Sequence, residues 1–580
     1  MDSSASIQAS MVYSVPKESE KLLHSAILDN SKINVPQDVK NLASKVKFVG
    51  ADDPAYPISL RFAESISTLK ALEGLTLVDL IQKKYHTQVD QITINTDLTQ
   101  GFLAPPPSVI TYIEQDKNGK ERIISSNDPQ AYNEFYDAHF KNMDLYNNMS
   151  HYNFSCTSIY KTKDGRYYHI HGSMSPQITQ AAINVPTKEA KPNMTFEEAW
   201  PVYQEAVEKF DAEELDKLAN DIHGQAGTIC YTPEEFKQTE QYKANQHVGL
   251  SETHYIDDNT PAQWWSKADE GTVERPLAGL KVLDITRIIA APVITRTLAQ
   301  YGASVMRVTS PHLPDFSALH SDMNSGKWTC ELDFHNEQDR QKLQALIEEA
   351  DVVVEGYRPF HLNKYGLGRE NLLAMAKKRG RGIIYIRENC YGWNGPWTER
   401  IGWQQISDAC CGISYLFGRS LGLDEPVTPV LPNSDFCTGS IGATSVIQAL
   451  IDRSTKGGSY VIDTALNYYN TWLGDCIGTY EDDVWKNLWE SKGKPLPRHY
   501  HNMVVMFPHF MALTRQFSPS MWQPDLFEDR EILDTTAKMR AYKSAVQFSG
   551  ETKPGYSIPT RGNGADAPHW PDDLTVKKVV

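Results

Sequence analysis

The sequence predicts an α/β fold, in which a parallel sheet is covered by helices on both faces, together with a smaller α+β domain. Between residues 276 and 475 short strands alternate with helices, which is the order that builds a parallel sheet. Each predicted strand is almost wholly apolar, as in strands that are buried on both faces. At about residues 155–245 a hairpin signal followed by helical segments predicts the smaller domain.

The first half of the chain is expected to hold several separate elements. A chain of 580 residues is too long for one ordinary hydrophobic core, so we expect more than one domain. Residues 1–50 are polar and irregular and are expected to form a lead-in segment, and residues 246–275 lack periodicity and are expected to form a linker. In between, at 51–245, the patterns predict a helix at 60–80, a strand at 90–96, a hairpin at 160–172 and helices at 195–244.

The second half, residues 276–475, carries the strands of the predicted sheet. Its elements are expected in the order strand 281–285, helix 293–301, strand 304–308, helix 343–350, strand 351–355, strand 382–386, a helix after Asp435 and a strand at about 462. Residues 476–580 are expected to return to this domain. A ligand site is then expected beyond the carboxyl ends of the strands, although no glycine-rich dinucleotide or nucleoside-triphosphate fingerprint follows any of them.

Composition excludes several classes of function. The formal net charge of −16 disfavours nucleic-acid binding, because neutralising phosphates requires a basic surface. A mean hydropathy of −0.46 and the shortness of the apolar runs disfavour a membrane protein. The first residues lack the features of a secretory signal, and the 8 cysteines show no paired-motif spacing. We therefore expect a cytoplasmic protein.

No metal site is predicted. His169 and His171 fall on one side of a predicted strand, and His499 with His501 repeats their spacing. A structural or catalytic metal needs at least three well-placed protein ligands, and the spacing supplies no third one. We expect ordinary histidines on the surface of a strand.

The second half resembles the family III CoA-transferases, also called the CaiB/BaiF family. Six phrases match the family in its own order: Pro276-Leu-Ala-Gly-Leu-Lys-Val-Leu-Asp-Ile-Thr-Arg, Tyr301-Gly-Ala-Ser-Val-Met-Arg-Val, Asn324-Ser-Gly-Lys with Glu331-Leu-Asp-Phe, Ala350-Asp-Val-Val-Val-Glu-Gly-Tyr-Arg-Pro, Tyr391-Gly-Trp-Asn-Gly-Pro-Trp, and Pro432-Asn-Ser-Asp-Phe-Cys-Thr-Gly. The resemblance covers about 200 residues, and it implies that the large domain is a Rossmann-like parallel sheet.

The resemblance also implies an activity and its partners. The family moves coenzyme A from an acyl-CoA to a carboxylic acid, here expected to be small or medium in size. The segment around Asp435 is similar to the one that holds the family's nucleophilic aspartate. Taken from its position alone, Asp435 is better suited to be the N-cap of the small-residue helix that follows it, and only the resemblance favours the nucleophile. Coenzyme A is expected only as part of the acyl-CoA substrate, and no metal is implied.

Four further residues are expected to contact the cofactor portion of the substrate. Arg358 and Arg287 follow predicted strands, where a guanidinium can grip a phosphate, and Lys327 lies in the Asn-Ser-Gly-Lys phrase. A solvated surface cation is the alternative for each of them. Trp403, followed by Gln404, stands where the racemase branch of the family has its His-Asp pair. Neither side chain can take a proton from carbon near neutral pH, so racemisation is disfavoured and Trp403 is expected to flank the CoA chain.

The first half resembles the later part of a second family unit. Tyr160-Lys-Thr-Lys-Asp-Gly is similar to the family's small domain, and Ile94-Asn-Thr-Asp-Leu is similar to Ile462-Asp-Thr-Ala-Leu. We interpret this order as a tandem duplication. Family members are typically interlocked dimers, so either a homodimer or a pseudo-dimer within one chain is expected. An acyl-CoA racemase or isomerase and a non-catalytic protein that binds CoA esters stay open as alternatives.

Overall fold

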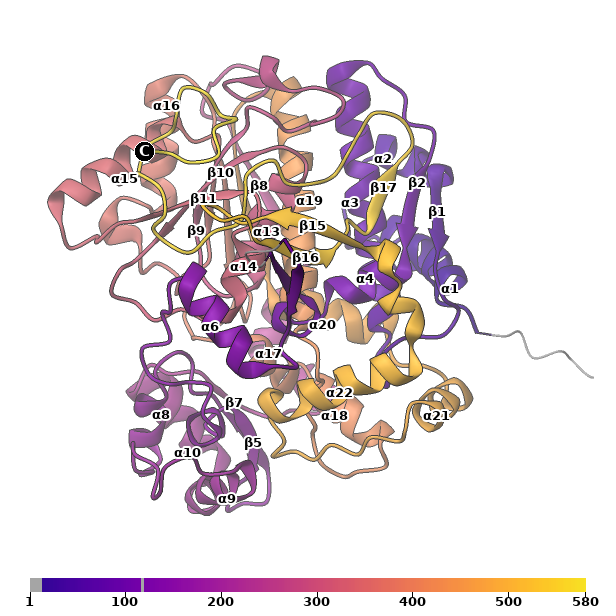
Figure 1. Ribbon diagram of the computed structural model, residues 1–580, viewed down its shortest axis with the longest axis vertical. Coiled ribbons are helices and arrows are strands. Elements are labelled where there is room, and N and C mark those ends of the chain that lie inside the picture. The colour runs from indigo at the N-terminus through magenta and orange to yellow at the C-terminus, as the bar shows by residue number, and fades with distance from the viewer. Residues whose placement is uncertain (1–12, 116–118) are drawn as a thin grey trace, which may run out of the picture.

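A seven-stranded sheet forms the centre of the computed structural model, which describes residues 13–115 and 119–580 (Figure 1). Its strand order is β11-β10-β9-β12-β13-β14-β8. The strands are β8 (Glu252–Ile256), β9 (Lys281–Ile285), β10 (Ser304–Thr309), β11 (Lys327–Glu331), β12 (Val352–Glu355), β13 (Ile384–Asn389) and β14 (Ser459–Ala465). All neighbours pair in parallel except β14 and β8. The predicted α/β fold class is therefore confirmed.

Helices cover both faces of this sheet. On one face α15 (Glu337–Glu349) and α16 (Arg369–Arg379) close a compact apolar cluster. On the other lie α13 (Ala290–Gln300) and α19 (Asn433–Lys456). The small residues of α19 allow this close approach, since a Cβ at Gly439 would lie 2.5 Å from Val293 and one at Gly442 would lie 2.6 Å from Ile294. A buried parallel sheet requires such cover.

The segment 246–275, expected to be a linker, instead contributes an edge strand. β8 runs antiparallel to β14, with Ile462 opposite Thr253. Its side chains are mostly half-buried or exposed, so the segment lacks the apolar run by which the other strands were recognised. Main-chain hydrogen bonds at a sheet edge do not require such a run.

The lead-in segment is also more ordered than its composition indicated. Among residues 13–50 the chain forms α1 (Val15–Leu22), α2 (Gln37–Asn41) and β1 (Val46–Val49), while residues 1–12 lie outside the described part of the chain. Leu22 and Ile27 are buried in the main hydrophobic core, and β1 pairs with β2 (Ile92–Asn95). The free energy gained by burying a few apolar side chains is thus enough to order a segment whose composition is mostly polar.

A helix–strand–helix order occurs twice in the chain. In the first half it is α3 (Phe62–Tyr85), β2 and α4 (Thr96–Phe102), and in the second half it is α19, β14 and α20 (Leu466–Trp472). Both long helices have 24 residues. At a constant spacing of 368 residues the two stretches share Gly74 and Gly442, Thr76 and Thr444, Val78 and Val446, Ile94 and Ile462, Thr96 and Thr464, and Leu98 and Leu466. This regularity is what a tandem duplication would produce.

The two repeated helices lie against each other in the core. Ser440 on α19 donates a hydrogen bond of 2.7 Å to Glu73 on α3, and Tyr301 donates another of 2.7 Å to the same carboxylate. Lys70 pairs with Glu73 at 2.8 Å. At the spacing of 368 residues Ser67 corresponds to Asp435. Ser67 is fully buried and donates to the carbonyl oxygen of Ala63.

The smaller domain lies at one corner of the molecule, below the central sheet in Figure 1. Its strands β5 (Ser158–Lys161), β6 (Tyr167–Ile170) and β7 (Gly227–Ile229) form an antiparallel sheet. Its helices are α7 (His151–Phe154), α8 (Pro176–Ala182), α9 (Phe196–Val207) and α10 (Ala212–Lys217). The prediction that His169 and His171 are surface histidines is wrong, because both are buried between this domain and the large one.

Residues 476–580 return to the rest of the molecule in three places. β15 (Phe527–Glu531) and β16 (Lys538–Tyr542) join β3 (Thr111–Gln115) and β4 (Glu121–Ile124) in a sheet, and β17 (Val546–Phe548) pairs with β2. The last residues run along β11, where Trp328 donates its indole hydrogen to the carbonyl of Val576 at 3.0 Å. The remaining helices are α5 (Pro106–Val109), α6 (Pro129–His139), α11 (Pro233–Phe236), α12 (Glu240–Asn245), α14 (His320–Met323), α17 (Gln404–Cys410), α18 (Ile413–Ser420), α21 (Asp482–Ser491) and α22 (Met503–Phe517).

Within the described ranges, no helix combines the length and apolar character needed to cross a bilayer. All 8 cysteines are free thiols, and only Cys476 is exposed. In the same ranges no three side chains of His, Cys, Asp or Glu gather closely enough to hold a metal ion.

Candidate active site

A cleft of about 400 Å³ opens at the carboxyl ends of the parallel strands, between the large and small domains. Its walls come from the segments that follow β9, β12, β13 and β14, and the small domain closes the other side. The wall residues used below are Ser173, Gln225, Arg287, Ile288, Pro314, Arg358, His361, Glu388, Cys390, Arg400, Trp403 and Asp435. β9 and β12 are neighbours although β10 and β11 lie between them in sequence. This change of direction places the cleft at the topological switch point of the sheet, the usual position of ligand sites in such folds.

Asp435 lies in the floor of this cleft. It is the third residue of α19, whose N-cap position is Pro432, and its carboxylate makes no capping bond. No described residue donates a hydrogen bond or forms an ion pair with that carboxylate, which is partly exposed to the cleft. The N-cap role is thus not used. The first-turn amides of a helix have no intrahelical acceptor and favour negative charge near them.

The surroundings make the charge on Asp435 costly. Burial, followed by the nearby carboxyls of Glu388 and Asp408, raises the pKa of Asp435 well above its ordinary value. Asp408 is buried and bonded to the side-chain amides of Asn470, at 2.9 Å, and Gln404, and burial raises its pKa to about 7. The carboxyls of Asp435, Glu388 and Asp408 are therefore coupled: a charge on one of them makes ionisation of its neighbours less favourable.

Glu388 is a cleft residue that the sequence patterns did not single out. Ile384, Ile386 and Glu388 alternate along β13, so they point to the same face of the sheet. Ile386 packs toward Gly442 of α19, which puts Glu388 at the end of the row that faces α19. An acidic residue two positions after a buried strand residue, at the carboxyl end of a parallel strand, is a signal that could have identified it.

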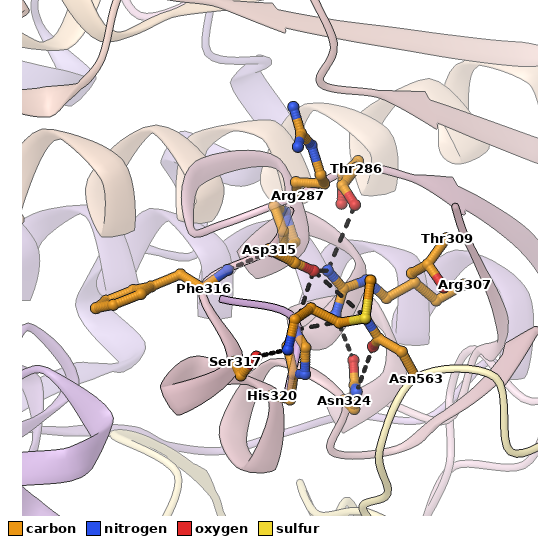
Figure 2. A network of polar contacts seen from close by, with 12 residues as sticks. Thr286, Arg287, Arg307, Thr309, Asp315, Phe316, Ser317, His320, Asn324 and Asn563 are labelled. Carbon is orange, nitrogen blue, oxygen red and sulfur yellow. Dashed lines mark hydrogen bonds and ion pairs between the residues drawn. The ribbon is translucent and has the colours of Figure 1, made fainter. Parts of the chain in front are cut away.

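Arg287 is held at the cleft by a loop that a buried polar network fixes (Figure 2). The guanidinium donates a hydrogen bond of 2.6 Å to the carbonyl of Pro314 and lies 5.2 Å from the ring centre of Tyr357. The next residue, Asp315, accepts from Arg307 at 3.2 Å and contacts His320 at 3.0 Å. The position of Arg287 is therefore determined before any ligand arrives.

Asp315 is the charge that organises this network. Burial alone would raise its pKa, but the contacts with His320 and Arg307 hold that pKa well below the ordinary range. Arg307 also donates to Asn324 at 2.6 Å, and Asn324 in turn donates to Asn563 at 3.2 Å (Figure 2). These bonds join β10, α14 and the segment around Asn563 to the loop that carries Pro314, and so they restrain that loop.

Arg358 lies at the cleft mouth and is exposed. It donates one hydrogen bond of 3.2 Å, to the carbonyl of Gly224 in the small domain. Arg400, also in the wall, is already paired with Asp216 of the small domain at 2.9 Å. Arg358 therefore has more of its donors free for an anionic ligand than Arg400 has.

Trp403 forms part of the wall where the two domains meet. Its ring lies parallel to that of His171, with centroids 5.4 Å apart, and its indole nitrogen donates to Ser173 Oγ at 3.0 Å. Ser173 Oγ donates in turn to Gln225 at 2.8 Å. Burial lowers the pKa of His171 to about 3, so this histidine is a neutral packing partner near neutral pH.

Backbone strain is concentrated at the same cleft. Ile288 has φ of 70° and Ser173 has φ of 50°, values in the left-handed region that β-branched residues in particular avoid. Both residues line the cleft. Such strain costs on the order of 1–3 kcal/mol per residue and is characteristic of functional sites.

Lys327 is not brought to the cleft. Its side chain is fully buried in the large domain, where Nζ lies 2.8 Å from Asp284 and 3.0 Å from the carbonyl of Pro292. Asp284 also accepts from Thr295 at 2.6 Å. Of the residues expected to form the site, the structure thus assembles Asp435, Arg287, Arg358 and Trp403, and it places Lys327 in the core behind them.

This arrangement suits nucleophilic chemistry on an anionic ester. An unpaired carboxyl lies at the base of a cleft, helix amides are close to it, and the guanidinium groups of Arg287 and Arg358 line the walls. A carboxylate that is not engaged with protein groups can attack an electrophilic carbonyl carbon, and the half-closed cleft excludes part of the surrounding water.

Comparisons with known proteins find CoA-transferases among the similar sequences. The sequence model of CoA-transferase family III matches residues 277–487. The acetyl-coenzyme A transferase nodX of Hypoxylon pulicicidum is 43% identical over 98% of this chain and 95% of its own length. An acyl-CoA transferase of Gibberella moniliformis is 35% identical over 79% of this chain and 80% of its own length.

More distant relatives match only part of the chain. The human succinyl-CoA:glutarate CoA-transferase is 29% identical over 33% of this chain, which spans 45% of that protein. A solved CAIB/BAIF family protein from Brucella suis is 30% identical with a TM-score of 0.32, over 39% of this chain and 60% of the solved one.

Proposed function

Because the chain belongs to CoA-transferase family III, we propose that it transfers CoA from an acyl-CoA to a free carboxylic acid through a covalent intermediate on Asp435. The observation that supports the proposal is that this carboxyl is unpaired. It lies in the cleft floor at the start of α19 and has no partner among the described residues. Structural carboxyls at such depth are normally hydrogen-bonded or paired.

In the first half of the reaction, CoA passes from the acyl group of the donor to Asp435. A carboxylate oxygen of Asp435 attacks the carbonyl carbon of the thioester, the carbon–sulfur bond breaks, and CoA leaves as a thiolate with its electron pair. The product is a mixed anhydride. The thiolate then attacks the aspartyl carbonyl carbon and displaces the donor acid as a free carboxylate, which leaves CoA bound to Asp435 as a thioester.

The second half repeats these steps with the acceptor. The acceptor carboxylate attacks the aspartyl thioester, CoA leaves again as a thiolate, and the new anhydride is opened at the acceptor's carbonyl. The cycle ends with a new acyl-CoA and free Asp435, and neither water nor a net proton is consumed. The first-turn amides of α19 are suited to stabilise the oxyanions of both halves.

Arg358 and Arg287 are proposed to bind the phosphates of CoA. Arg358 is exposed at the mouth of the cleft, and Arg287 is fixed by Pro314 and Tyr357. A guanidinium binds phosphate through paired, charge-assisted hydrogen bonds. Trp403 is proposed to lie along the pantetheine arm, since its ring forms part of the wall between the mouth and Asp435.

The acyl groups are proposed to be small or medium in size. The similar protein of Hypoxylon pulicicidum is named for acetyl-CoA and that of Gibberella moniliformis for acyl-CoA in general. A cleft of about 400 Å³ must also hold the end of the pantetheine arm, which leaves limited room for the acyl chain. The 7 buried free thiols are typical of a reducing compartment, and we propose the cytoplasm.

The cleft is proposed to be a pseudo-dimer interface within one chain. Its small-domain wall precedes the linking strand β8 in sequence, and its large-domain wall follows it. The ion pair between Arg400 and Asp216 and the bond between Arg358 and Gly224 join the two walls. One chain can therefore supply both sides of a site that interlocked subunits of the family build together.

Trapping the covalent intermediate tests this proposal. With an acyl-CoA donor, hydroxylamine should convert Asp435 into a hydroxamate that mass spectrometry locates on the peptide of α19. Asp435→Asn should abolish both the adduct and CoA exchange, whereas Asp463→Asn, a buried aspartate of β14 outside the cleft, should keep the adduct. Exchange without any adduct would contradict the proposal. Deuterium wash-in at the acyl α-carbon without exchange would favour a racemase or isomerase instead.

A further inference from the structure

Glu388 and Asp435 face each other across the floor of the cleft from two different elements. Glu388 ends the row Ile384–Ile386 of β13 that faces α19, and Asp435 is in the first turn of α19 itself. Both side chains are partly exposed to the same cavity. They lie close enough for the charge of Glu388 to act on the proton affinity of Asp435.

Neither carboxyl has a protein partner. Across residues 13–115 and 119–580 no donor bonds to the side-chain oxygens of Glu388, and none bonds to those of Asp435. This distinguishes them from Asp408, which accepts from Asn470 and Gln404, and from Glu355, which accepts from Tyr385. Two unsatisfied carboxyls in one partly dry cavity cannot both be charged at low cost.

We propose that Glu388 and Asp435 form a carboxyl pair that carries a single negative charge, so that Glu388 must hold a proton for Asp435 to attack. The inference rests on the proposed function of Asp435 as the nucleophile. Glu388 forms no bond with the substrate and gives it no proton, so it is a positioning residue: its protonation sets the charge of the cleft floor in which Asp435 reacts. The proton stays on Glu388 during transfer, and no atom is gained or lost by the pair.

The charged groups around the pair are consistent with one negative charge. Burial raises the pKa of Glu388 to about 8, and burial together with Glu388 and Asp408 raises that of Asp435. The cleft also holds Arg287, Arg358, Arg400 and His361, but among the described residues none of these four forms a hydrogen bond or ion pair with either carboxyl. The thiol of Cys390 faces the same carboxyls, and burial keeps it protonated by raising its pKa.

A second negative charge would oppose every chemical step. The attack of Asp435 produces an oxyanion, and its collapse produces a thiolate, both within the same cavity. An ionised Glu388 would repel each of them, and repulsion between unit charges is strong where water is partly excluded. A fully protonated pair would fail for the opposite reason, because a neutral Asp435 is a poor nucleophile.

The pH profile of CoA exchange tests the pair. We expect a bell-shaped profile for the wild-type protein, with an alkaline limb above about pH 8. Burial alone raises the pKa of Glu388 to about 8, and a negative charge on Asp435 moves the second ionisation of the pair to higher pH. Glu388→Gln mimics the protonated side chain and cannot ionise, so it should keep activity at pH 7 and lose the alkaline limb. Glu388→Asp still titrates, so it should keep a limb whose midpoint is shifted. This second variant decides the question if Glu388→Gln does not fold.

Glu355 provides the matched control. It also ends a parallel strand, and burial raises its pKa to about 7, but it bonds to Tyr385 on the opposite face of the sheet and does not line the cleft. Glu355→Gln should therefore leave the alkaline limb in place.

The outcomes also separate this inference from the proposed function. An alkaline limb that persists unchanged in Glu388→Gln, while the hydroxylamine-sensitive adduct on Asp435 still forms, would overturn the pair and leave the nucleophile intact. Absence of the adduct in the wild-type protein would overturn the proposed function itself. Loss of the limb in Glu388→Gln with the adduct retained would support both.

Discussion

The indole nitrogen of Trp403 donates a hydrogen bond of 3.0 Å to Ser173 Oγ, although the two residues belong to different domains and lie 230 positions apart. The bond joins the two domains within the wall of the cleft, and the ring of His171 lies parallel to the same indole. Trp403 therefore connects the small domain to the segment that leads into α17. Its position is set by the domain arrangement and not by its neighbours in sequence.

Removing this bond should weaken substrate binding. A neutral hydrogen bond contributes about 0.5–1.5 kcal/mol, so Trp403→Phe should raise the KM for acyl-CoA by roughly 2- to 12-fold with a smaller change in kcat. Trp393→Phe is the control, because Trp393 donates a similar bond of 2.9 Å to the carbonyl of Thr464 outside the cleft. Steady-state kinetics of both variants measure the difference, and equal effects would contradict a binding role.

Arg358→Ala should weaken binding of CoA esters specifically through charge. Hydrogen bonds to charged groups contribute about 1.5–3 kcal/mol, so KM should rise by roughly 10- to 150-fold and depend less on salt, while kcat changes little. Arg379→Ala, on α16 and outside the cleft, is the matched control. An acyl-pantetheine substrate, which lacks the nucleotide phosphates, should show no difference between Arg358→Ala and wild type.

Each chain should form one covalent adduct. At the spacing of 368 residues the first half has Ser67 where the second has Asp435, and the hydroxyl of Ser67 is buried and bonded to Ala63. Intact-protein mass spectrometry after trapping should therefore show a single hydroxamate per chain at saturating acyl-CoA. A second adduct would mean that another carboxylate acts as a nucleophile. Ser67→Ala should leave the count unchanged.

Lys327 should matter for stability and not for binding. Removing one partner of a buried ion pair costs about 3–5 kcal/mol, so Lys327→Met should lower the free energy of unfolding by about that amount. The KM of the folded variant for acyl-CoA should remain close to that of the wild type, because Lys327 is buried against Asp284 behind the cleft. Denaturant unfolding and steady-state kinetics test the two statements separately.

The same site predicts a pH dependence of stability. Burial lowers the pKa of Lys327 from 10.5 to about 8, although Asp284 opposes the shift. The unfolded chain then binds more protons than the folded protein between about pH 8 and 10.5, so the contribution of Lys327 to stability increases with pH across that window. The wild-type free energy of unfolding should therefore rise relative to that of Lys327→Met from pH 8 to 10. Parallel curves would contradict the shift.

Much of the fold follows from local patterns in the second half. The strands β9, β10, β12 and β13 lie close to their predicted positions because each is a short apolar run between turn signals. β8 has no such run. It exists because β14 offers an unpaired edge, and a sheet edge can be covered by almost any extended segment. α1 was missed for a related reason, since its few apolar residues become a pattern only when the core they enter is known.

Some residues of the candidate site could likewise be predicted from the sequence, and others could not. Asp435 and Arg358 follow apolar segments in phrases that resemble a known family, so their positions could be read from the sequence. Glu388 lies in none of the matching phrases. Its place at the carboxyl end of a strand could have marked it as a cleft residue, but its orientation toward α19 required the structure. Lys327 lies in a matching phrase as well, yet its side chain turns inward to Asp284. A motif specifies where the backbone goes, whereas burial decides what the side chain can contact.

The contact between Glu73 and Ser440 has a consequence for how this protein can change over time. In a symmetric assembly of identical subunits, every substitution appears twice and must be acceptable on both sides of the axis. Here the two long helices that meet belong to one gene product, so an acid on α3 can face a hydroxyl on α19 without the reverse pairing ever having to exist. Each half is therefore free to change by itself.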